Sequence, residues 1–235
     1  MSLSVVLPCY NEAKSLPLLL ARYAKASAEL SFELILVNNG STDNTKEVIS
    51  QLLKNPIYEF VKVVPVQKNQ GYGYGLMAGL KAAQGNFLAY SHADMQCAPE
   101  DVFLAFKKLV SQKNPQKILL KGKRQGRGFS ERTITFFMGL IATIVLGKKL
   151  SDINAQPKVF HRSLLAYLQG APSGFEFDLF VLYQAKKNGW RIETIPVQFS
   201  KRMFGQSHWN ISFLAKWKTI CKTLAYIFKL KFQNL

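Results

Sequence analysis

Short apolar runs alternate with amphipathic segments along the first 98 residues. Four runs have the length and continuous hydrophobicity of buried parallel strands, at residues 3–7, 32–37, 59–66 and 87–90. The segments between them place apolar residues at helical spacing, at residues 13–30, 43–53 and 69–83. This alternation predicts an α/β fold with a doubly wound, mostly parallel, Rossmann-like sheet and right-handed crossovers.

The pattern is less regular after residue 98. We expect further strands at residues 117–121, 156–160 and 191–199, and helices at residues 99–112 and 176–187. Residues 134–146 are almost wholly apolar, and a basic amphipathic helix begins near Ile211. We therefore divide the chain into a catalytic domain, residues 1–209, and an appendage, residues 210–235. Residues 1–98 would form the nucleotide-binding half of the domain and residues 99–209 the acceptor half.

The chain is strongly basic, which indicates an anionic partner. Lys and Arg total 31 against 14 Asp and Glu, so the net charge of the 235 residues is +17. Phosphates, nucleic acid and acidic lipid all fit such a charge. Nucleic acid is disfavoured because the basic residues are not interleaved with a groove-reading motif. The three cysteines are too few and too scattered for a disulfide framework, and no signal peptide is recognisable, so we expect a cytoplasmic location.

Three potential metal ligands follow the apolar run at 87–90. His92, Asp94 and Gln96 stand at alternate positions, so an extended backbone points all three the same way. The carboxyl end of a strand is where ligands bind in an open α/β sheet. Oxygen ligands suit Mg²⁺ or Mn²⁺, and a histidine nitrogen would favour Mn²⁺. The alternative is a polar strand end with an Asx turn at Asp94.

Two further segments have the composition of phosphate-binding loops. Glycines at 71, 73 and 75 let the backbone approach a donor, or simply close a tight turn. A basic segment at residues 122–132 follows the strand expected at 117–121, and its guanidinium groups suit a phosphate. The alternative for the second segment is a solvated charged face.

Four ordered motifs resemble those of family-2 glycosyltransferases with the GT-A fold. They are Pro8-Cys9-Tyr10-Asn11-Glu12, Asn38-Asn39-Gly40-Ser41, the loop at 69–75 and His92-Ala93-Asp94-Met95-Gln96. The second half, with Asp152 and the segment 202–207, is most similar to polyprenyl-phosphate sugar synthases of the dolichol-phosphate mannose synthase type. The resemblance implies that Pro8, Tyr10, Glu12, Asn38, Gly71 and His92 bind a UDP- or GDP-sugar. It also implies that Asp94 and Gln96 hold the metal and diphosphate, and that Arg124, Arg132 and Arg202 hold phosphates.

Two departures from the family pattern reduce the negative charge near the donor. His92 replaces the first acid of Asp-x-Asp, and Asn38-Asn39 replaces Asp-Asp. An amide differs from a carboxylate because it donates as well as accepts hydrogen bonds. These changes leave the donor open, and they keep a catalytically impaired nucleotide-sugar-binding module among the alternatives.

The reaction depends on the acceptor. A polyprenyl phosphate is already anionic and can attack the sugar in line, with inversion and without a base. A glycan hydroxyl, as in cell-surface polysaccharide synthesis, needs a base, for which Glu176 and Asp178 are the candidates. Both residues also suit the first turn of a helix, where acids favour the dipole.

The last helix predicts contact with an acidic membrane surface. Its apolar face comprises Phe213, Leu214, Trp217, Ile220, Leu224, Ile227 and Phe228, with lysines largely on the opposite face. No apolar run reaches the ~18 residues of a spanning helix, so we expect a peripheral protein on the inner face of the membrane. Its expected partners include a membrane protein. The alternative is a helix that packs on the catalytic domain.

Overall fold

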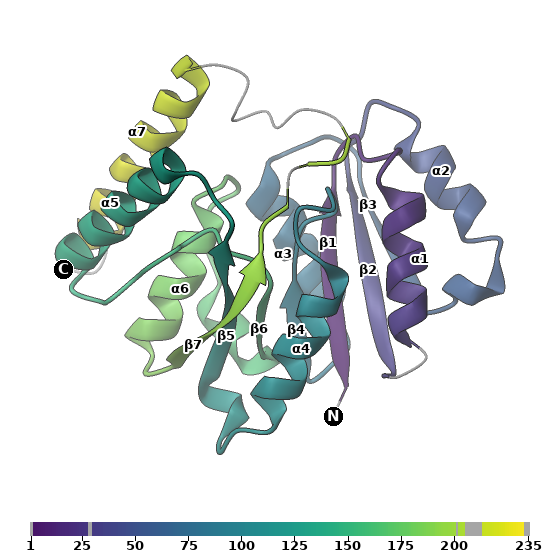
Figure 1. The fold of residues 1–235 in the computed structure, drawn as a ribbon, viewed down its shortest axis with the longest axis horizontal. Helices are drawn as coiled ribbons and strands as arrows, with labels where there is room; N and C mark the ends of the chain where they lie inside the picture. Colours follow the sequence, from purple (N-terminus) through teal and green to yellow (C-terminus); the bar gives the residue numbers. More distant parts are fainter. Residues whose placement is uncertain (1, 28–29, 201, 205–212, 233–235) are drawn as a thin grey trace.

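A single mixed sheet organises the molecule (Figure 1). The computed structural model describes residues 2–27, 30–200, 202–204 and 213–232. Within these residues the sheet has seven strands in the order β3-β2-β1-β4-β6-β5-β7. The strands are β1 (Leu3–Cys9), β2 (Phe32–Asn39), β3 (Val61–Val66), β4 (Phe87–Tyr90), β5 (Ile118–Gln125), β6 (Lys158–His161) and β7 (Arg191–Gln198).

Helices cover both faces of this sheet (Figure 1). The α-helices are α1 (Leu16–Ser27), α2 (Thr45–Leu52), α3 (Tyr72–Ala82), α4 (Pro99–Val110), α5 (Phe129–Leu146), α6 (Phe177–Lys187) and α7 (Phe213–Phe232). Short 3₁₀ turns are η1 (Pro56–Tyr58), η2 (Pro115–Lys117) and η3 (Arg162–Tyr167). Two apolar clusters form the core, one with α1 and α4 and the other with α3 and α6. Neighbouring β1 residues divide between them, since Val5 belongs to the first cluster and Val6 to the second.

The strand directions confirm the predicted doubly wound, mostly parallel sheet. β1 pairs in parallel with β2 and with β4, and β2 pairs in parallel with β3. Only β6 runs the other way among the described strands, because it pairs antiparallel with both β4 and β5. β5 and β7 are again parallel. The carboxyl ends of β1, β2, β4, β5 and β7 therefore meet at one edge.

The segment expected as a basic loop, residues 122–132, is largely regular structure. β5 continues to Gln125 and α5 begins at Phe129, so only residues 126–128 connect them. The prediction of a long phosphate-wrapping loop is therefore wrong. The reason is that β7 pairs with β5 along its whole length, up to Gln125 and Gln198, which holds the basic residues in an extended ladder.

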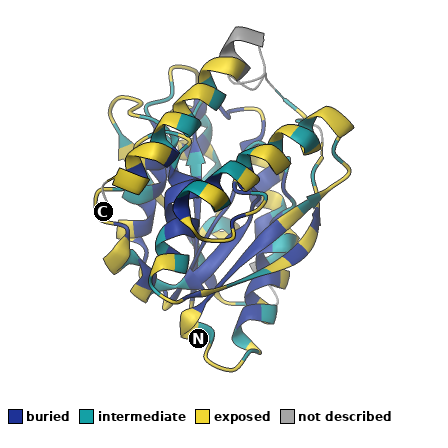
Figure 2. Cartoon of the chain, turned by 90° about the vertical axis from the view of Figure 1, so that its left-hand side faces the viewer, coloured by how far each residue is buried: buried dark blue, intermediate teal, exposed yellow. Residues whose placement is uncertain are grey.

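Helices α5 and α7 pack side by side and form an outer layer (Figures 1 and 2). Ile227 and Leu230 of α7 are buried, whereas Trp217 and Phe228 are exposed, so the predicted apolar face of α7 is split. The side chains of Phe213 and Leu214 and the residues 210–212 and 233–235 lie outside the described part of the chain. The large exposed apolar side chains of α5 are Phe129, Ile134, Phe136, Phe137, Leu140 and Ile144.

α5 is longer than the apolar run in the sequence suggested. It has 18 residues, of which 17% are buried. By length and composition alone it is apolar enough to cross a membrane. The expectation that no segment reaches that length is therefore corrected. Gly139, Ala142 and Leu146 nevertheless pack inward, which ties α5 to the domain along one side.

Candidate active site

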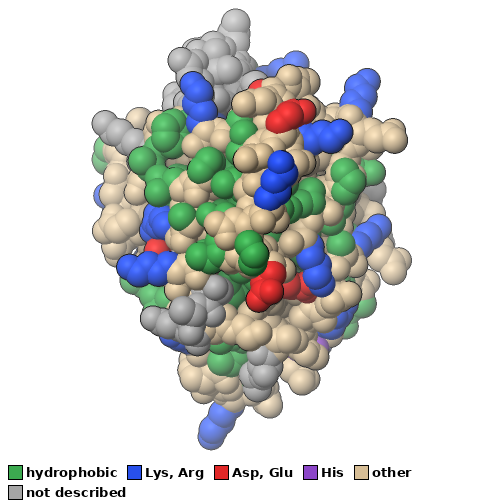
Figure 3. Space-filling view, turned by 90° about the vertical axis from the view of Figure 1, so that its right-hand side faces the viewer, with side chains coloured by type: hydrophobic (Ala, Val, Ile, Leu, Met, Phe, Trp, Pro, Cys, Tyr) green, Lys and Arg blue, Asp and Glu red, His purple; other side chains and the backbone are tan. Residues whose placement is uncertain are grey.

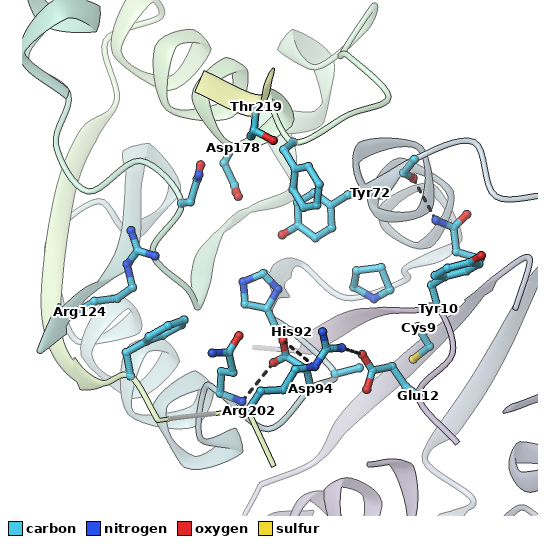
Figure 4. Close-up of a pocket in the computed structure, with 18 of the residues that line it drawn as sticks. Cys9, Tyr10, Glu12, Tyr72, His92, Asp94, Arg124, Asp178, Arg202 and Thr219 are labelled. Carbon is cyan, nitrogen blue, oxygen red and sulfur yellow. Dashed lines mark hydrogen bonds and ion pairs between the residues drawn. The ribbon is translucent and has the colours of Figure 1, made fainter. Parts of the chain in front are cut away.

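A cavity of about 560 Å³ lies at the carboxyl edge of the sheet (Figure 4). The ends of β1, β2, β4, β5 and β7 contribute to its wall, together with α3, α5, α6 and α7. This is the convergence of strand ends that the sequence predicted. The residues that line it include Pro8, Tyr10, Glu12, Asn39, Gly71, Tyr72, His92, Asp94, Gln96, Arg124, Arg127, Glu131, Phe175, Asp178, Phe199, Arg202, Thr219 and Thr223.

His92, Asp94 and Gln96 all face the cavity, as their alternation predicted. The backbone, however, is not extended there. β4 ends at Tyr90, and Met95 adopts a left-handed conformation with φ of 63°. Asp94 Oδ1 accepts a 3.1 Å hydrogen bond from the Gln96 amide, so the Asx turn considered as an alternative is also present. The turn leaves Oδ2 of Asp94 on the cavity side, near Arg202.

This corner offers oxygen ligands for a divalent metal. Among the described residues, no group of three or more His, Cys, Asp and Glu side chains is placed to hold an ion. Asp94 and the side-chain oxygen of Gln96 still suit Mg²⁺ or Mn²⁺, which commonly take one carboxylate and complete their shell with substrate phosphates. Burial lowers the pKa of His92, so its imidazole is neutral. The residues therefore fit a metal that binds together with a diphosphate.

Arg202 joins two acids of the site (Figure 4). Its guanidinium donates to Glu12 and lies 3.8 Å from Oδ2 of Asp94. The Ser15 hydroxyl also donates to Glu12, at 2.8 Å. Burial raises the pKa of Glu12, and the charge of Arg202 opposes that rise. Glu12, for which a donor-binding role is predicted, lines the cavity while paired with Arg202.

A second cationic cluster stands across the cavity. Asp152 accepts from the backbone and guanidinium of Arg124, with Nε 2.9 Å from Oδ1, and these contacts lower the pKa of Asp152 against the effect of burial. The guanidinium groups of Arg124 and Arg127 lie 5.4 and 6.0 Å from the centre of the Phe199 ring. Arg132, by contrast, is exposed on α5 and does not line the cavity. Arg127, which belongs to the predicted basic segment but received no role from the resemblance, thus lines the cavity beside Arg124.

Asp178 is the acceptor at the centre of a buried polar network. Its Oδ1 accepts from Lys158 Nζ at 2.6 Å, Tyr90 Oη at 2.9 Å and Gln156 Nε2 at 3.1 Å. Burial lowers the pKa of Lys158, and its pairing with Asp178 offsets part of that effect. Asp178 also lies in the first turn of α6, the position that the helix-dipole interpretation expects. Glu176 precedes that helix, makes no side-chain cap bond and does not line the cavity.

The glycine-rich segment packs backbone against backbone. A Cβ on Gly73 would lie 2.2 Å from the carbonyl oxygen of Pro172, and one on Gly71 would lie 2.4 Å from that of Ser173. The amide of Tyr74 donates to the same Ser173 carbonyl at 3.1 Å. These glycines therefore allow α3 to meet the loop before α6, and Gly71 in addition lines the cavity.

Aromatic rings form one wall of the cavity. The Tyr72 and Phe175 rings stack at 5.5 Å with planes 20° apart, and Tyr72 and His92 lie 5.9 Å apart. At the end of β2, Asn39 lines the cavity, whereas the side-chain oxygen of Asn38 accepts a hydrogen bond from the Ser41 amide within its own turn. The structure therefore brings Asn39, and not the predicted Asn38, to the site. β2 extends to Asn39, and successive side chains of a strand point to opposite faces of the sheet. This alternation is the sequence signal that distinguishes Asn39 from Asn38.

Known proteins with the same sequence pattern and fold are glycosyltransferases. The family model described as Glycosyl transferase family 2 matches residues 4–114. The undecaprenyl-phosphate 4-deoxy-4-formamido-L-arabinose transferase of Photorhabdus laumondii is 28% identical over 212 residues, which cover 88% of this chain and 62% of the relative. The enzyme of the same name from Yersinia enterocolitica is 26% identical with equal coverage. The chain thus spans about three fifths of the length of these relatives.

Solved structures agree in fold. Glucosyl-3-phosphoglycerate synthase from Mycobacterium tuberculosis, in complex with Mn²⁺, UDP and glucosyl-3-phosphoglycerate, superposes with a TM-score of 0.72 and 20% identity. The match covers 98% of this chain and 79% of that one. A mannosyltransferase from Pyrobaculum calidifontis, in complex with GDP-mannose and Mn²⁺, gives 0.65 and 18%, over 86% of this chain and 58% of that one. The chain thus matches the model of glycosyl transferase family 2 over residues 4–114 and shares the fold of these solved glycosyltransferases.

Proposed function

We propose that the protein is a metal-dependent hexosyltransferase that moves a sugar, with inversion, from a UDP- or GDP-sugar to a polyprenyl phosphate. The proposal rests on one observation. The helices that carry the exposed apolar face also wall the cavity, through Glu131 of α5 and Thr219 and Thr223 of α7. A substrate with an anionic head and an apolar tail fits this combination of an arginine-lined cavity and an apolar outer layer.

The donor would occupy the end of the cavity formed by β1 and β4. Pro8 and Tyr10 lie there for the nucleoside, and Asp94 and Gln96 for the diphosphate. A divalent metal bound by Asp94 and Gln96 would supply charge stabilisation to the leaving diphosphate. The relatives named above support this assignment, since one solved structure contains UDP with Mn²⁺ and another GDP-mannose with Mn²⁺.

The acceptor phosphate would lie opposite, against Arg124 and Arg127. Both guanidinium groups lie against the Phe199 ring and are held in place before any substrate binds. Arg124 donates to Asp152, and Arg127 donates to Glu131 and Thr135. Preorganised cations stabilise charge without a reorganisation cost at the moment of reaction. The curated relatives, which act on undecaprenyl phosphate by name, support an acceptor of this class.

The chemistry then reduces to positioning. A phosphate oxygen of the acceptor attacks the anomeric carbon as the bond from that carbon to the donor diphosphate breaks. The attacking group is already anionic and gives up no proton, so a general base is unnecessary. The rival reading, transfer to a glycan hydroxyl, needs such a base. Of the two candidates for that base, Glu176 does not line the cavity, and Asp178 is held in a 2.6 Å ion pair with Lys158.

We also propose that the protein lies on the inner face of the membrane, with α5 and α7 in the interface. Figure 2 shows how much of the outward surface of these two helices is exposed. An exposed apolar patch of this kind usually marks a membrane or protein contact. On the opposite side of the molecule, basic side chains are spread among apolar ones (Figure 3).

A transfer assay tests the proposal. The chain is incubated with Mn²⁺ or Mg²⁺, a panel of UDP- and GDP-sugars and either a polyprenyl phosphate or the matching polyprenol. We expect a glycosylated lipid only with the phosphate. Asp94→Ala should reduce the rate by at least ~100-fold, since it removes charge stabilisation of the leaving group, whereas the exposed Glu59→Gln should leave it unchanged. A product with the polyprenol alone would contradict the proposal and favour its rival, transfer to a hydroxyl group.

A further inference from the structure

Asp178 and Tyr72 both accept from the Gln156 amide, and the proposed transfer chemistry uses neither of them. Gln156 Nε2 donates both to the Tyr72 hydroxyl, at 3.0 Å, and to Asp178, at 3.1 Å from Oδ1 and 3.3 Å from Oδ2. The two side chains therefore lie beside the same amide group, and both line the cavity (Figure 4). Gln156 itself is fully buried, so the arrangement is fixed from behind.

Each member of the pair keeps one hydrogen-bonding function for a ligand. A carboxylate accepts about four hydrogen bonds. Three donors converge on Oδ1 of Asp178, whereas Oδ2 receives only the longer contact from Gln156. The Tyr72 oxygen accepts from Gln156, and no described residue accepts the proton of its hydroxyl. The cavity thus meets an acceptor next to a donor, which is what a single alcohol group needs, since it donates and accepts at once.

The position of the pair relative to Asp94 identifies the alcohol. His92 lies between Asp94 and Asp178 on the wall of the cavity (Figure 4). In Figure 4, Asp178 and Tyr72 lie on the side of His92 that faces away from Asp94. If Asp94 faces the diphosphate, as proposed above, the group beyond His92 is the sugar attached to the distal phosphate. The aromatic wall of Tyr72 and Phe175 borders the same space.

We propose that Asp178 and Tyr72 bind one hydroxyl group of the donor sugar and so select among nucleotide-sugars. In this role Asp178 is a fixed acceptor and transfers no proton. Lys158 holds the carboxylate in place from the buried side, which makes it a positioning residue. The proposal rests on the proposed function, because it requires the donor to occupy this cavity.

Binding without an acceptor tests the proposal directly. Titration calorimetry with the full chain and Mn²⁺ first compares the affinities for UDP and GDP with those for UDP- and GDP-sugars whose sugar is an uncharged hexose. Monodeoxy analogues of the tightest donor then locate the hydroxyl. We expect one deoxy position to lose about 10- to 100-fold in affinity, the range for a hydrogen bond to a charged group.

The variants must lose the same discrimination. Tyr72→Phe keeps the ion pair intact, and Asp178→Leu combined with Lys158→Met removes both buried charges together, which protects folding. Each variant should bind the intact donor more weakly and no longer distinguish it from the deoxy analogue. Its affinity for the nucleoside diphosphate should stay within about threefold of the parent chain. Tyr90→Phe, which removes a donor from the buried side of the same carboxylate, is the matched control and should retain discrimination.

The outcomes separate the two proposals. If the variants lose affinity for nucleoside diphosphate and donor alike, or still discriminate against the deoxy analogue, the sugar-binding role is wrong. If donor binding is unchanged and only turnover with a hydroxyl acceptor falls, Asp178 is a base instead. If the parent chain binds neither nucleoside diphosphates nor their sugar conjugates, the proposed function itself fails.

Discussion

The exposed apolar face of α5 gives the most direct quantitative prediction. Phe129, Phe136 and Ile144 are 85%, 65% and 70% exposed, values unusual for such side chains in water. Replacing all three with Asp should leave the fold intact, because none contributes to either apolar core cluster. The same change should abolish attachment to a membrane surface if α5 lies in the interface.

The size of the effect follows from the exposed fractions. Complete burial of a Phe or Ile side chain stabilises by ~1.5–3 kcal/mol. Scaled by these fractions, each residue contributes about 1–2 kcal/mol to membrane binding, or roughly 3–6 kcal/mol for the three. This corresponds to a partition coefficient about 10²- to 10⁴-fold lower in the triple variant, before the repulsion of the new carboxylates by acidic lipid.

Sedimentation with liposomes of acidic phospholipid measures this coefficient. The matched control replaces Leu18 of α1, Ile57 of η1 and Leu104 of α4 with Asp. The three native side chains are 41%, 57% and 53% exposed. The control should bind as the parent does. If both variants stay bound, lysine charge alone accounts for attachment. If both are released equally, the effect is one of net charge, and in either case α5 is not the inserted element.

Three further changes test the interior and the site. Burial lowers the pKa of Lys121 to about 7, so between pH 7 and 10.5 the unfolded chain holds a proton that the folded chain has lost. The stability should rise over this range by about 1.4 kcal/mol per pH unit, and urea unfolding of Lys121→Met should lack that slope. Gly73→Ala should lower the free energy of unfolding by ~1–3 kcal/mol because its Cβ meets backbone, whereas Gly128→Ala, with nothing within 4 Å, should be neutral; equal effects would contradict the packing argument. Arg202→Met removes the charge that opposes the raised pKa of Glu12, so an ionised Glu12 without its charged partner should destabilise the fold by ~1–3 kcal/mol at pH 8. That deficit should shrink as the pH falls and Glu12 is protonated, and thermal unfolding at pH 8 and pH 5 would show whether it does.

Local patterns were enough to predict the order of strands and helices and the edge of the sheet at which the cavity lies. The run at 87–90 coincides with β4, and strand ends of this kind depend on a few neighbouring residues. His92, Asp94 and Gln96 line the cavity as expected, but a turn after Tyr90, and not an extended strand, places them there, and their role as metal ligands stays a prediction.

Contacts between distant segments could not be predicted from such patterns. Arg202 and Glu12 are 190 residues apart in the chain yet form an ion pair. Lys121 and Lys158 are register partners on β5 and β6 and are both buried, although lysine is rarely buried. Arg127, and not the predicted Arg132, lines the cavity. The reason is that pairing with β7 extends β5 to Gln125 and α5 begins at Phe129, so that Arg132 lies on a helix. Each of these facts depends on the assembled sheet.

The single antiparallel strand also has a consequence for the order of folding. β1 to β4 pair among themselves, and all four are complete by Tyr90. β5 reaches that unit only through β6, which begins at Lys158. During synthesis the first half can thus close its sheet early, while β5 and α5 wait with an unpaired edge until β6 emerges. Pulse-labelled hydrogen exchange should find the amides of β1 and β2 protected before those of β5.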